Sequence, residues 1–244
     1  MTGHQLLRCA LEVVEAADAA AHVDELPALV LPALAEALGA ETASWTTFVG
    51  PRERLVRRHT GYPGPLLDAA GAEAFERNLA GFPLGLHTRP GGAGHPVRRS
   101  DLQGKRALHR SGMYAEVLRP LGAEELLATS LRHHDAHVCL SLHRSGRDFS
   151  DSSVELLTRL RPLLARRATL LDLAGRAACP TVLTPRQRDV LSLVGLGLTD
   201  AAIAHRLGCS PRTVDKHLEH IYRRLGVRGR AAATAVWLGG PPRR

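Results

Sequence analysis

The C-terminal part of the chain alternates short stretches of helical apolar periodicity with glycine and proline. Within residues 200–207 the apolar side chains recur on one face of a short helix, and Thr199 stands where the N-cap belongs. Gly208 permits a left-handed turn, and Ser210 with the proline after it signals the start of a new helix. The pattern therefore predicts two helices joined by a tight turn, the second over Pro211–Leu225.

The second of these helices has two unlike faces. Its apolar residues recur on one stripe that can pack against the first helix, namely Val214, Leu218, Ile221 and Leu225. The opposite face is polar and partly basic, and carries Arg212, Lys216, Glu219 and Arg223, with Asp215 and His220 at its margins. Such a pair is typical of a helix-turn-helix, whose second helix enters the major groove of DNA.

Two further helices complete a compact all-α domain. Thr184 and Gln187 form a capping box at a helix start, and Gly195 ends that helix. The alanine-rich stretch over residues 229–238 predicts a last helix with a smooth side for close packing. We therefore expect a four-helix domain over residues 181–240.

The first 180 residues mix helical and strand periodicity. Helical periodicity predicts helices over residues 4–20 and 23–39 and a long helix from Asp151 onward. Alternating apolar and polar residues predict two pairs of strands, at 42–49 with 53–60 and at 124–133 with 136–144. Helices that flank an antiparallel sheet make an α+β domain.

The basic charge is concentrated near the C-terminal end. The chain carries 32 Lys and Arg against 24 Asp and Glu, and residues 181–244 hold 11 of these basic and 4 of these acidic residues. Nearly all of the net charge of +8 therefore accompanies the predicted helix-turn-helix. A basic module attached to a neutral one indicates a polyanion as partner, because Lys and Arg neutralise phosphates.

Short motifs recur along this C-terminal stretch. They stand at Leu183-Thr184-Pro185-Arg186, Ile203-Ala204, Leu207, Ser210, Thr213-Val214, His217, Leu225-Gly226-Val227 and Arg230. Together they resemble the LuxR-type DNA-binding domain of bacterial transcription regulators. The resemblance implies a transcription regulator that binds double-stranded DNA as a homodimer at inverted-repeat sites. The sequence departs from the family pattern at Asp215, a position often held by lysine.

Nine residues are expected to bind DNA. Arg206, Arg212, Arg223 and Arg224 can neutralise phosphates, and Ser210 and Thr213 can hydrogen-bond them at the helix start. The resemblance to the LuxR type puts Asp215, Lys216 and Glu219 at base-reading positions. Aromatic residues make up only 4% of the chain, which argues against stacking platforms for single strands or RNA.

The N-terminal order of elements, and above all the ending SLHRSGRDFSDSSVELLTRLRPLLARR, is similar to a GAF-type sensory domain. The resemblance implies a terminal helix that carries signal or dimer contacts and, in some members, a small molecule between sheet and helices. We expect a GAF-like sensory or dimerisation domain over residues 1–173, a linker over 174–180 and the LuxR-type domain over 181–240. Pro162 is expected to kink the helix that leads out of the first domain.

Other chemistries fit the first 180 residues less well. His133, His134, His137 and His143 suggest a metal or catalytic site, but the strand-like alternation around them favours surface histidines. No Ser-His-Asp or Cys-His constellation and no phosphate loop can be assembled, so we expect a non-enzymatic protein without metal or cofactor. The paired acids of a phosphorylatable receiver, the aromatic pattern of an autoinducer domain and the polymerase-binding region of a sigma factor are all missing.

Composition also bears on the compartment. No apolar run approaches the roughly 18 residues that a membrane span needs, and the N-terminal stretch carries charges that a signal peptide lacks. The cysteines lie far apart without a CxxC pair, and we expect reduced, mostly buried thiols at Cys9, Cys139, Cys179 and Cys209. We expect a cytoplasmic protein that does not contact the membrane.

Overall fold

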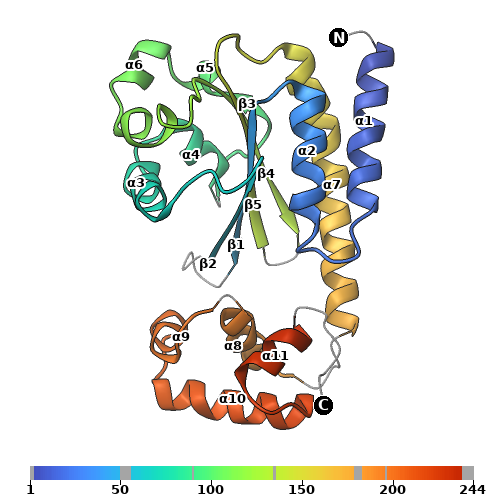
Figure 1. Cartoon of the computed structure of the whole chain (residues 1–244), viewed down its shortest axis with the longest axis vertical. Helices are drawn as coiled ribbons and strands as arrows, with labels where there is room; N and C mark the ends of the chain where they lie inside the picture. Colours follow the sequence, from blue (N-terminus) through green and yellow to red (C-terminus); the bar gives the residue numbers. More distant parts are fainter. Residues whose placement is uncertain are drawn as a thin grey trace. The chain divides into compact units, whose positions relative to one another are not determined.

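The computed structural model describes residues 3–49, 56–89, 91–133, 136–178, 183–195 and 197–237 (Figure 1). The described residues fall into two compact units, and the chain passes from the first to the second between Thr169 and Leu170, inside helix α7 (Asp151–Ala178). The first unit contains a sheet and helices, and the second is helical. The predicted α+β class of the N-terminal part and all-α class of the C-terminal part are confirmed.

Five strands form one sheet in the order β2-β1-β5-β4-β3. They are β1 (Thr42–Val49), β2 (Val56–Tyr62), β3 (Val97–Arg98), β4 (Glu125–His133) and β5 (Ala136–Arg144). β5 lies at the centre of the sheet and pairs antiparallel with both β1 and β4, with Trp45 opposite Leu140 in the first pair. The strands predicted at 42–49 and 136–144 have the predicted bounds, whereas β2 ends two residues later than predicted.

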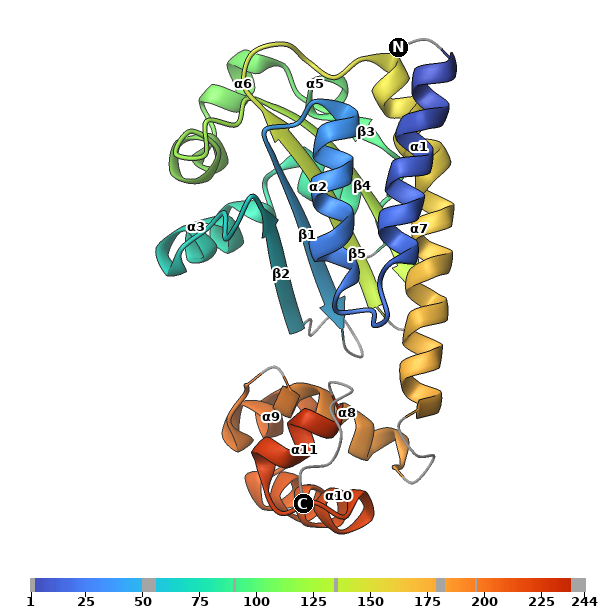
Figure 2. The same cartoon turned by 45° about the vertical axis from the view of Figure 1, so that its right-hand side comes forward.

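Helices lie on both sides of this sheet (Figures 1 and 2). One side is covered by α1 (Gly3–Asp18), α2 (Leu26–Leu38) and α7. The other side carries α3 (Ala69–Leu79), α4 (Pro83–Thr88), α5 (Arg99–Leu102), α6 (Lys105–His109) and the π-helix η2 (Tyr114–Leu118). This second set packs a buried core that includes Phe82, Val97, Leu108, Met113, Val117 and Leu126. The central strand β5 alternates Val138, Leu140 and Leu142 on one face with His137, Cys139, Ser141 and His143 on the other.

Helix α7 extends further than the sequence suggested. It runs to Ala178, so residues 174–178 of the segment expected as a linker are helical. It also continues past Pro162, which lies inside the helix. Packing stabilises the helix despite the proline, because α7 buries several leucines on one face, including Leu157, Leu160 and Leu164.

Besides the last residues of α7, the described part of the second unit contains four helices, as predicted. They are α8 (Pro185–Gly195), α9 (Asp200–Leu207), α10 (Pro211–Leu225) and α11 (Arg230–Trp237). All four contribute to one buried core, which includes Val190, Leu191, Ile203, Val214, Leu218, Ile221 and Ala233. The predicted bounds of the second helix, α10, are confirmed at both ends.

The thiols differ from expectation. Cys9, Cys139 and Cys209 are only half-buried, and Cys179 lies outside the described residues. None of the described helices combines the length and the apolar character needed to cross a membrane.

Candidate DNA-binding interface

The turn between α9 and α10 is held by the residues that the sequence marks for it. The Thr199 side chain caps α9 by accepting a hydrogen bond from the amide of Ala202 at 3.3 Å. Gly208 ends α9 in the left-handed region, with φ of 64°, where a side chain would be strained. Ser210 then caps α10 by accepting from the amide of Thr213 at 3.1 Å. The helix pair is therefore a helix-turn-helix with both helix starts capped.

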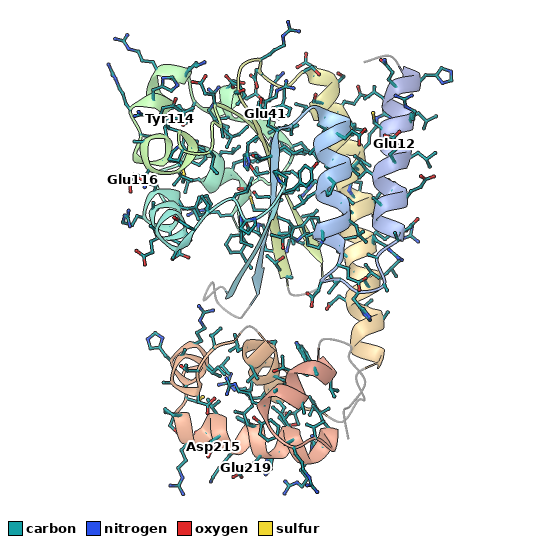
Figure 3. The ribbon with its side chains drawn as sticks, viewed as in Figure 1. Glu12, Glu41, Tyr114, Glu116, Asp215 and Glu219 are labelled. Atoms are coloured by element: carbon teal, nitrogen blue, oxygen red, sulfur yellow. The ribbon has the colours of Figure 1, made fainter. Side chains whose placement is uncertain are left out.

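Helix α10 divides into a buried and an exposed face, as its pattern predicts. Val214 and Ile221 are fully buried and Leu218 is 3% exposed. The opposite side chains are all exposed, namely Arg212, Asp215, Lys216, Glu219, His220 and Arg223. Asp215 and Glu219 are labelled on α10 in Figure 3. We call this exposed set the outer face of α10.

The start of α10 presents hydroxyl groups beside its amides. The Ser210 and Thr213 hydroxyls hydrogen-bond each other at 2.8 Å, with Ser210 exposed and Thr213 half-buried. The first turn of any helix also leaves amide groups without intrahelical partners, and the helix dipole makes this end partly positive. This combination suits an anionic oxygen such as a phosphate.

The four arginines expected at phosphates do not have the same surroundings. Arg224 is exposed but donates to the Gln187 Oε1 at 3.0 Å, the same atom that accepts the Thr184 amide at 3.0 Å in the capping box of α8. It therefore also ties the end of α10 to the start of α8. Arg206 is half-buried in the last turn of α9. Arg212 and Arg223 have no hydrogen bond or ion pair with any residue in the described ranges.

Two arginines outside the expected set brace the unit internally. Arg230 forms an ion pair with the Asp200 carboxylate at 2.6 Å and also donates to the Leu198 carbonyl. Arg186 donates to the carbonyl of Leu207 at 2.6 Å, at the last residue of α9. Both lie in motifs that the sequence shares with the LuxR type, which is the only sequence signal that marks them. They fix the ends of α9 and so the position of the turn.

His217 lies between the buried and exposed faces of α10. Partial burial lowers the pKa of this histidine, and the positive charges of Arg186 and His220 lower it further. Its imidazole is therefore neutral at pH 7 and adds no positive charge to the helix.

The histidines of the first unit take part in structural hydrogen bonds. His137 contacts the Thr88 carbonyl through Nε2 at 2.6 Å, and His143 contacts the hydroxyls of Thr42 and Ser141 at 3.0 and 2.9 Å. Residue 134 and the side chain of His133 lie outside the description. Within the described part of the chain, no group of three or more metal-ligating side chains is placed to hold a metal ion.

A hollow of about 400 Å³ lies beside β2 and α3 in the first unit. Its lining is mostly apolar and consists of His59, Thr60, Gly61, Gly64, Pro65, Leu67, Ala72 and Phe75. The volume falls in the range of small-molecule pockets, which are lined by apolar groups with a few polar ones that orient the ligand.

The second unit thus has the geometry of a helix-turn-helix domain, and comparison with known proteins places it in a family. Residues 181–237 match the model of the bacterial regulatory proteins of the luxR family. The chain is 31% identical over 154 residues to the nitrate/nitrite response regulator protein NarP of Escherichia coli, covering 57% of this chain and 67% of NarP. The chain therefore belongs to the LuxR family.

Other similarities are more local. An HTH-type transcriptional regulator of Mycobacterium bovis is 54% identical over 48 residues, which is 20% of this chain and 5% of that protein. The chain thus spans only a small fraction of the length of this relative. Among solved structures, the GAF domain of an Acinetobacter phosphoenolpyruvate-protein phosphotransferase is 14% identical with a TM-score of 0.48, over 72% of this chain and 99% of that one.

Proposed function

We propose that this chain is a non-enzymatic transcription regulator that binds double-stranded DNA in a sequence-specific manner, as a homodimer. Helix α10 enters the major groove with its outer face toward the bases. The observation that carries the proposal is this outer face, which is charged, exposed and opposite a fully buried stripe in a capped helix-turn-helix of the LuxR family.

The residues divide by the part of DNA that their chemistry suits. Phosphates are bound by side chains around the helix start and along its flanks, namely Arg206, Ser210, Arg212, Thr213, Arg223 and Arg224. Base edges are read from the outer face by Asp215, Lys216 and Glu219. The basic excess of residues 181–244 supports this assignment, because it supplies the sequence-independent part of the affinity.

Duplex binding can be tested through its dependence on salt. Fluorescence anisotropy with a labelled duplex at several salt concentrations gives the number of neutralised phosphates as the slope of log K against log salt. We expect Arg212→Ala to weaken binding and to lower this slope by about one. The matched control is Arg159→Ala, an exposed arginine of α7 paired with Glu155 in the first unit, which should leave the slope unchanged. Two results would contradict the proposal: no duplex binding at low salt, or the same slope for the unmodified chain, Arg212→Ala and Arg159→Ala.

The first unit is proposed to sense a signal or to mediate dimerisation. The hollow beside β2 and α3 supports a small, mostly apolar ligand, and exposed leucines on α1 support contact with a second copy. Native mass spectrometry of the full-length chain distinguishes the two roles. A dimer with added organic mass, lost in the pocket-filling variant Ala72→Trp, supports ligand sensing. A dimer of unmodified mass supports dimerisation alone, and a monomer argues against both.

A further inference from the structure

The outer face of α10 carries two carboxylates one helical turn apart, Glu219 near the centre of the face and Asp215 at its margin. Their spacing of four residues separates them by about 40° around the helix and about 6 Å along it. Both are exposed, and neither forms a hydrogen bond or an ion pair with any residue that the structure describes. Figure 3 labels the two residues at neighbouring places along α10. This arrangement is unusual for a helix proposed to approach a polyanion.

Helix stability accounts for these carboxylates only in part. Glu219 lies four residues before Arg223 and Asp215 three residues after Arg212, spacings at which opposite charges attract, yet neither pair comes within ion-pair distance among the described residues. Like charges four residues apart repel each other on a helix surface. Asp215 also lies beyond the first turn of α10, which holds no acidic residue, so the positive end of the helix dipole does not favour it. In addition, both carboxylates repel the phosphates that the neighbouring Arg212 and Arg223 attract. Their presence is best explained by a partner that donates hydrogen bonds.

Few hydrogen-bond donors lie in the major groove, and the base that carries a donor determines which base a carboxylate can contact. An ionised carboxylate is an acceptor only. Guanine presents two acceptors in the major groove, and thymine presents an acceptor and a methyl group. Adenine presents a donor directly beside an acceptor, whereas cytosine presents a donor alone. Cytosine is therefore the one base whose major-groove edge a carboxylate can contact without facing an acceptor.

Resting on the proposed function, we propose that Asp215 and Glu219 each select a cytosine in the DNA half-site. The distance of about 6 Å along the helix corresponds to about two base-pair steps, so the two cytosines lie within that span of each other. Lys216 lies on the same face, about 60° from Glu219 and 100° from Asp215. As a donor without acceptor capacity, it suits the two acceptors of guanine. The half-site read by this helix is thus rich in C·G pairs.

The carboxylates also lower the affinity for the wrong sequence. At a DNA site without cytosine, the two carboxylates lie near hydrogen-bond acceptors and phosphates and gain no hydrogen bond in return. The binding free energy at such a site is therefore less favourable. Neutral, nearly isosteric variants should therefore show two changes at once. Asp215→Asn and Glu219→Gln should lose cytosine selection and bind unrelated duplexes more tightly than the unmodified chain. A purely structural role for either residue predicts neither change.

The test is a binding selection from random duplexes with the full-length chain, followed by affinity measurements on the selected site. We expect two cytosine positions per half-site, and replacement of either C·G pair by T·A should weaken binding about tenfold. Asp215→Asn should abolish the discrimination at one position and Glu219→Gln at the other. Glu155→Gln, an exposed glutamate of α7 in the first unit, should preserve both.

The outcomes separate the two proposals. If the unmodified chain enriches no sequence, the proposed function itself is wrong. If it enriches a site that lacks cytosines within about two steps of each other, or if both variants keep the cytosine preference, DNA binding stands and the role of the carboxylates is overturned. If Asp215→Asn and Glu219→Gln still bind unrelated duplexes, the variants are folded, and their loss of cytosine preference is not caused by unfolding.

Discussion

At the scale of single residues, the side chains of the second unit divide by what they contact. Gln187 accepts hydrogen bonds from both the Thr184 amide and Arg224, and Arg230 contacts Asp200. These groups join helices to one another. Arg212, by contrast, is exposed and its side chain has no hydrogen bond or ion pair among the described residues, as the proposed phosphate contact requires. Substitutions of the first kind should affect stability as well as binding, because they remove contacts within the fold.

His143 of β5 makes the stability of the first unit depend on pH. Burial, and to a lesser degree the charge of His59, lower its pKa from 6.5 to about 4. In the unfolded chain His143 is protonated as the pH falls below about 6.5, whereas in the folded chain it stays neutral until about pH 4. The free energy of unfolding therefore decreases as the pH falls from about 6.5 to about 4. We expect the free energy of unfolding to fall by about 2 kcal/mol between pH 7 and pH 5 through this residue.

The measurement is urea unfolding followed by the fluorescence of Trp45, which is 2% exposed in β1. The sequence contains two tryptophans, so a Trp237→Phe background isolates the first unit. His143→Gln should reduce the loss of stability between pH 7 and pH 5, leaving the smaller effect of His137, whose pKa burial also lowers. The same loss with and without His143 would show that this residue does not cause it.

The sequence predicted side-chain contacts correctly where the two partners lie a few residues apart along the chain. Thr199 and Ser210 were predicted as caps and are caps, because a cap bonds to an amide three residues away. The link from Arg224 to Gln187 was not predicted, since it joins residues 37 positions apart. The half-burial of Cys139 was also missed, because burial depends on neighbouring elements rather than on residue type alone.

At the scale of elements, strong periodicity predicted the positions of the strands and both pairs of strands adjacent along the chain, β1 with β2 and β4 with β5, but not the pairing of one pair with the other. Helix α10 and strands β1 and β5 have their predicted bounds. The pairing of β1 with β5 brings together segments that are far apart in sequence, and no local pattern encodes such a contact. The helices from α3 to η2 were not predicted; α4, α5, α6 and η2 span only four to six residues each, fewer than two helical turns, so an apolar period cannot repeat in them.

Helix α7 gives a direct prediction at this scale. Pro162 is exposed within the helix and has no amide to donate to the carbonyl four residues earlier. Pro162→Ala should restore that hydrogen bond and stabilise the first unit by up to about 3 kcal/mol. Thermal unfolding monitored at Trp45 would detect the rise in Tm. Leu163→Ala, the exposed neighbour, is the control and should not raise it. An unchanged or lower Tm in Pro162→Ala would mean that the proline does not interrupt the helix.

At the scale of the whole molecule, the chain combines a nearly neutral α+β unit with a basic helical one. The first unit exposes two large leucines on α1, Leu7 at 69% and Leu11 at 55%. They lie one helical turn apart and opposite the buried Val13, so they form an apolar ridge on the outside of α1. Two such ridges from two copies can bury each other, which is the contact that the proposed homodimer needs.

We therefore expect the variant Leu7→Glu with Leu11→Glu to be monomeric. Charged side chains at both positions would have to lose water in the interface without a partner. Light scattering after size-exclusion chromatography measures the mass directly. The matched control is Leu102→Glu on α5, a leucine with 39% exposure on the other side of the sheet, which should remain dimeric. A dimeric double variant would place the contact between copies elsewhere.

The central claim is that the outer face of α10 contacts duplex DNA, and the sequence allows a direct test. It contains two lysines, Lys216 on this face and Lys105, which forms an ion pair with Glu124 in the first unit. Acylation by an amine-reactive reagent, read by mass spectrometry with and without saturating duplex, compares the two in one sample. Bound duplex should slow the modification of Lys216 and leave that of Lys105 unchanged. Equal rates for Lys216 in the free and bound chain would contradict the claim.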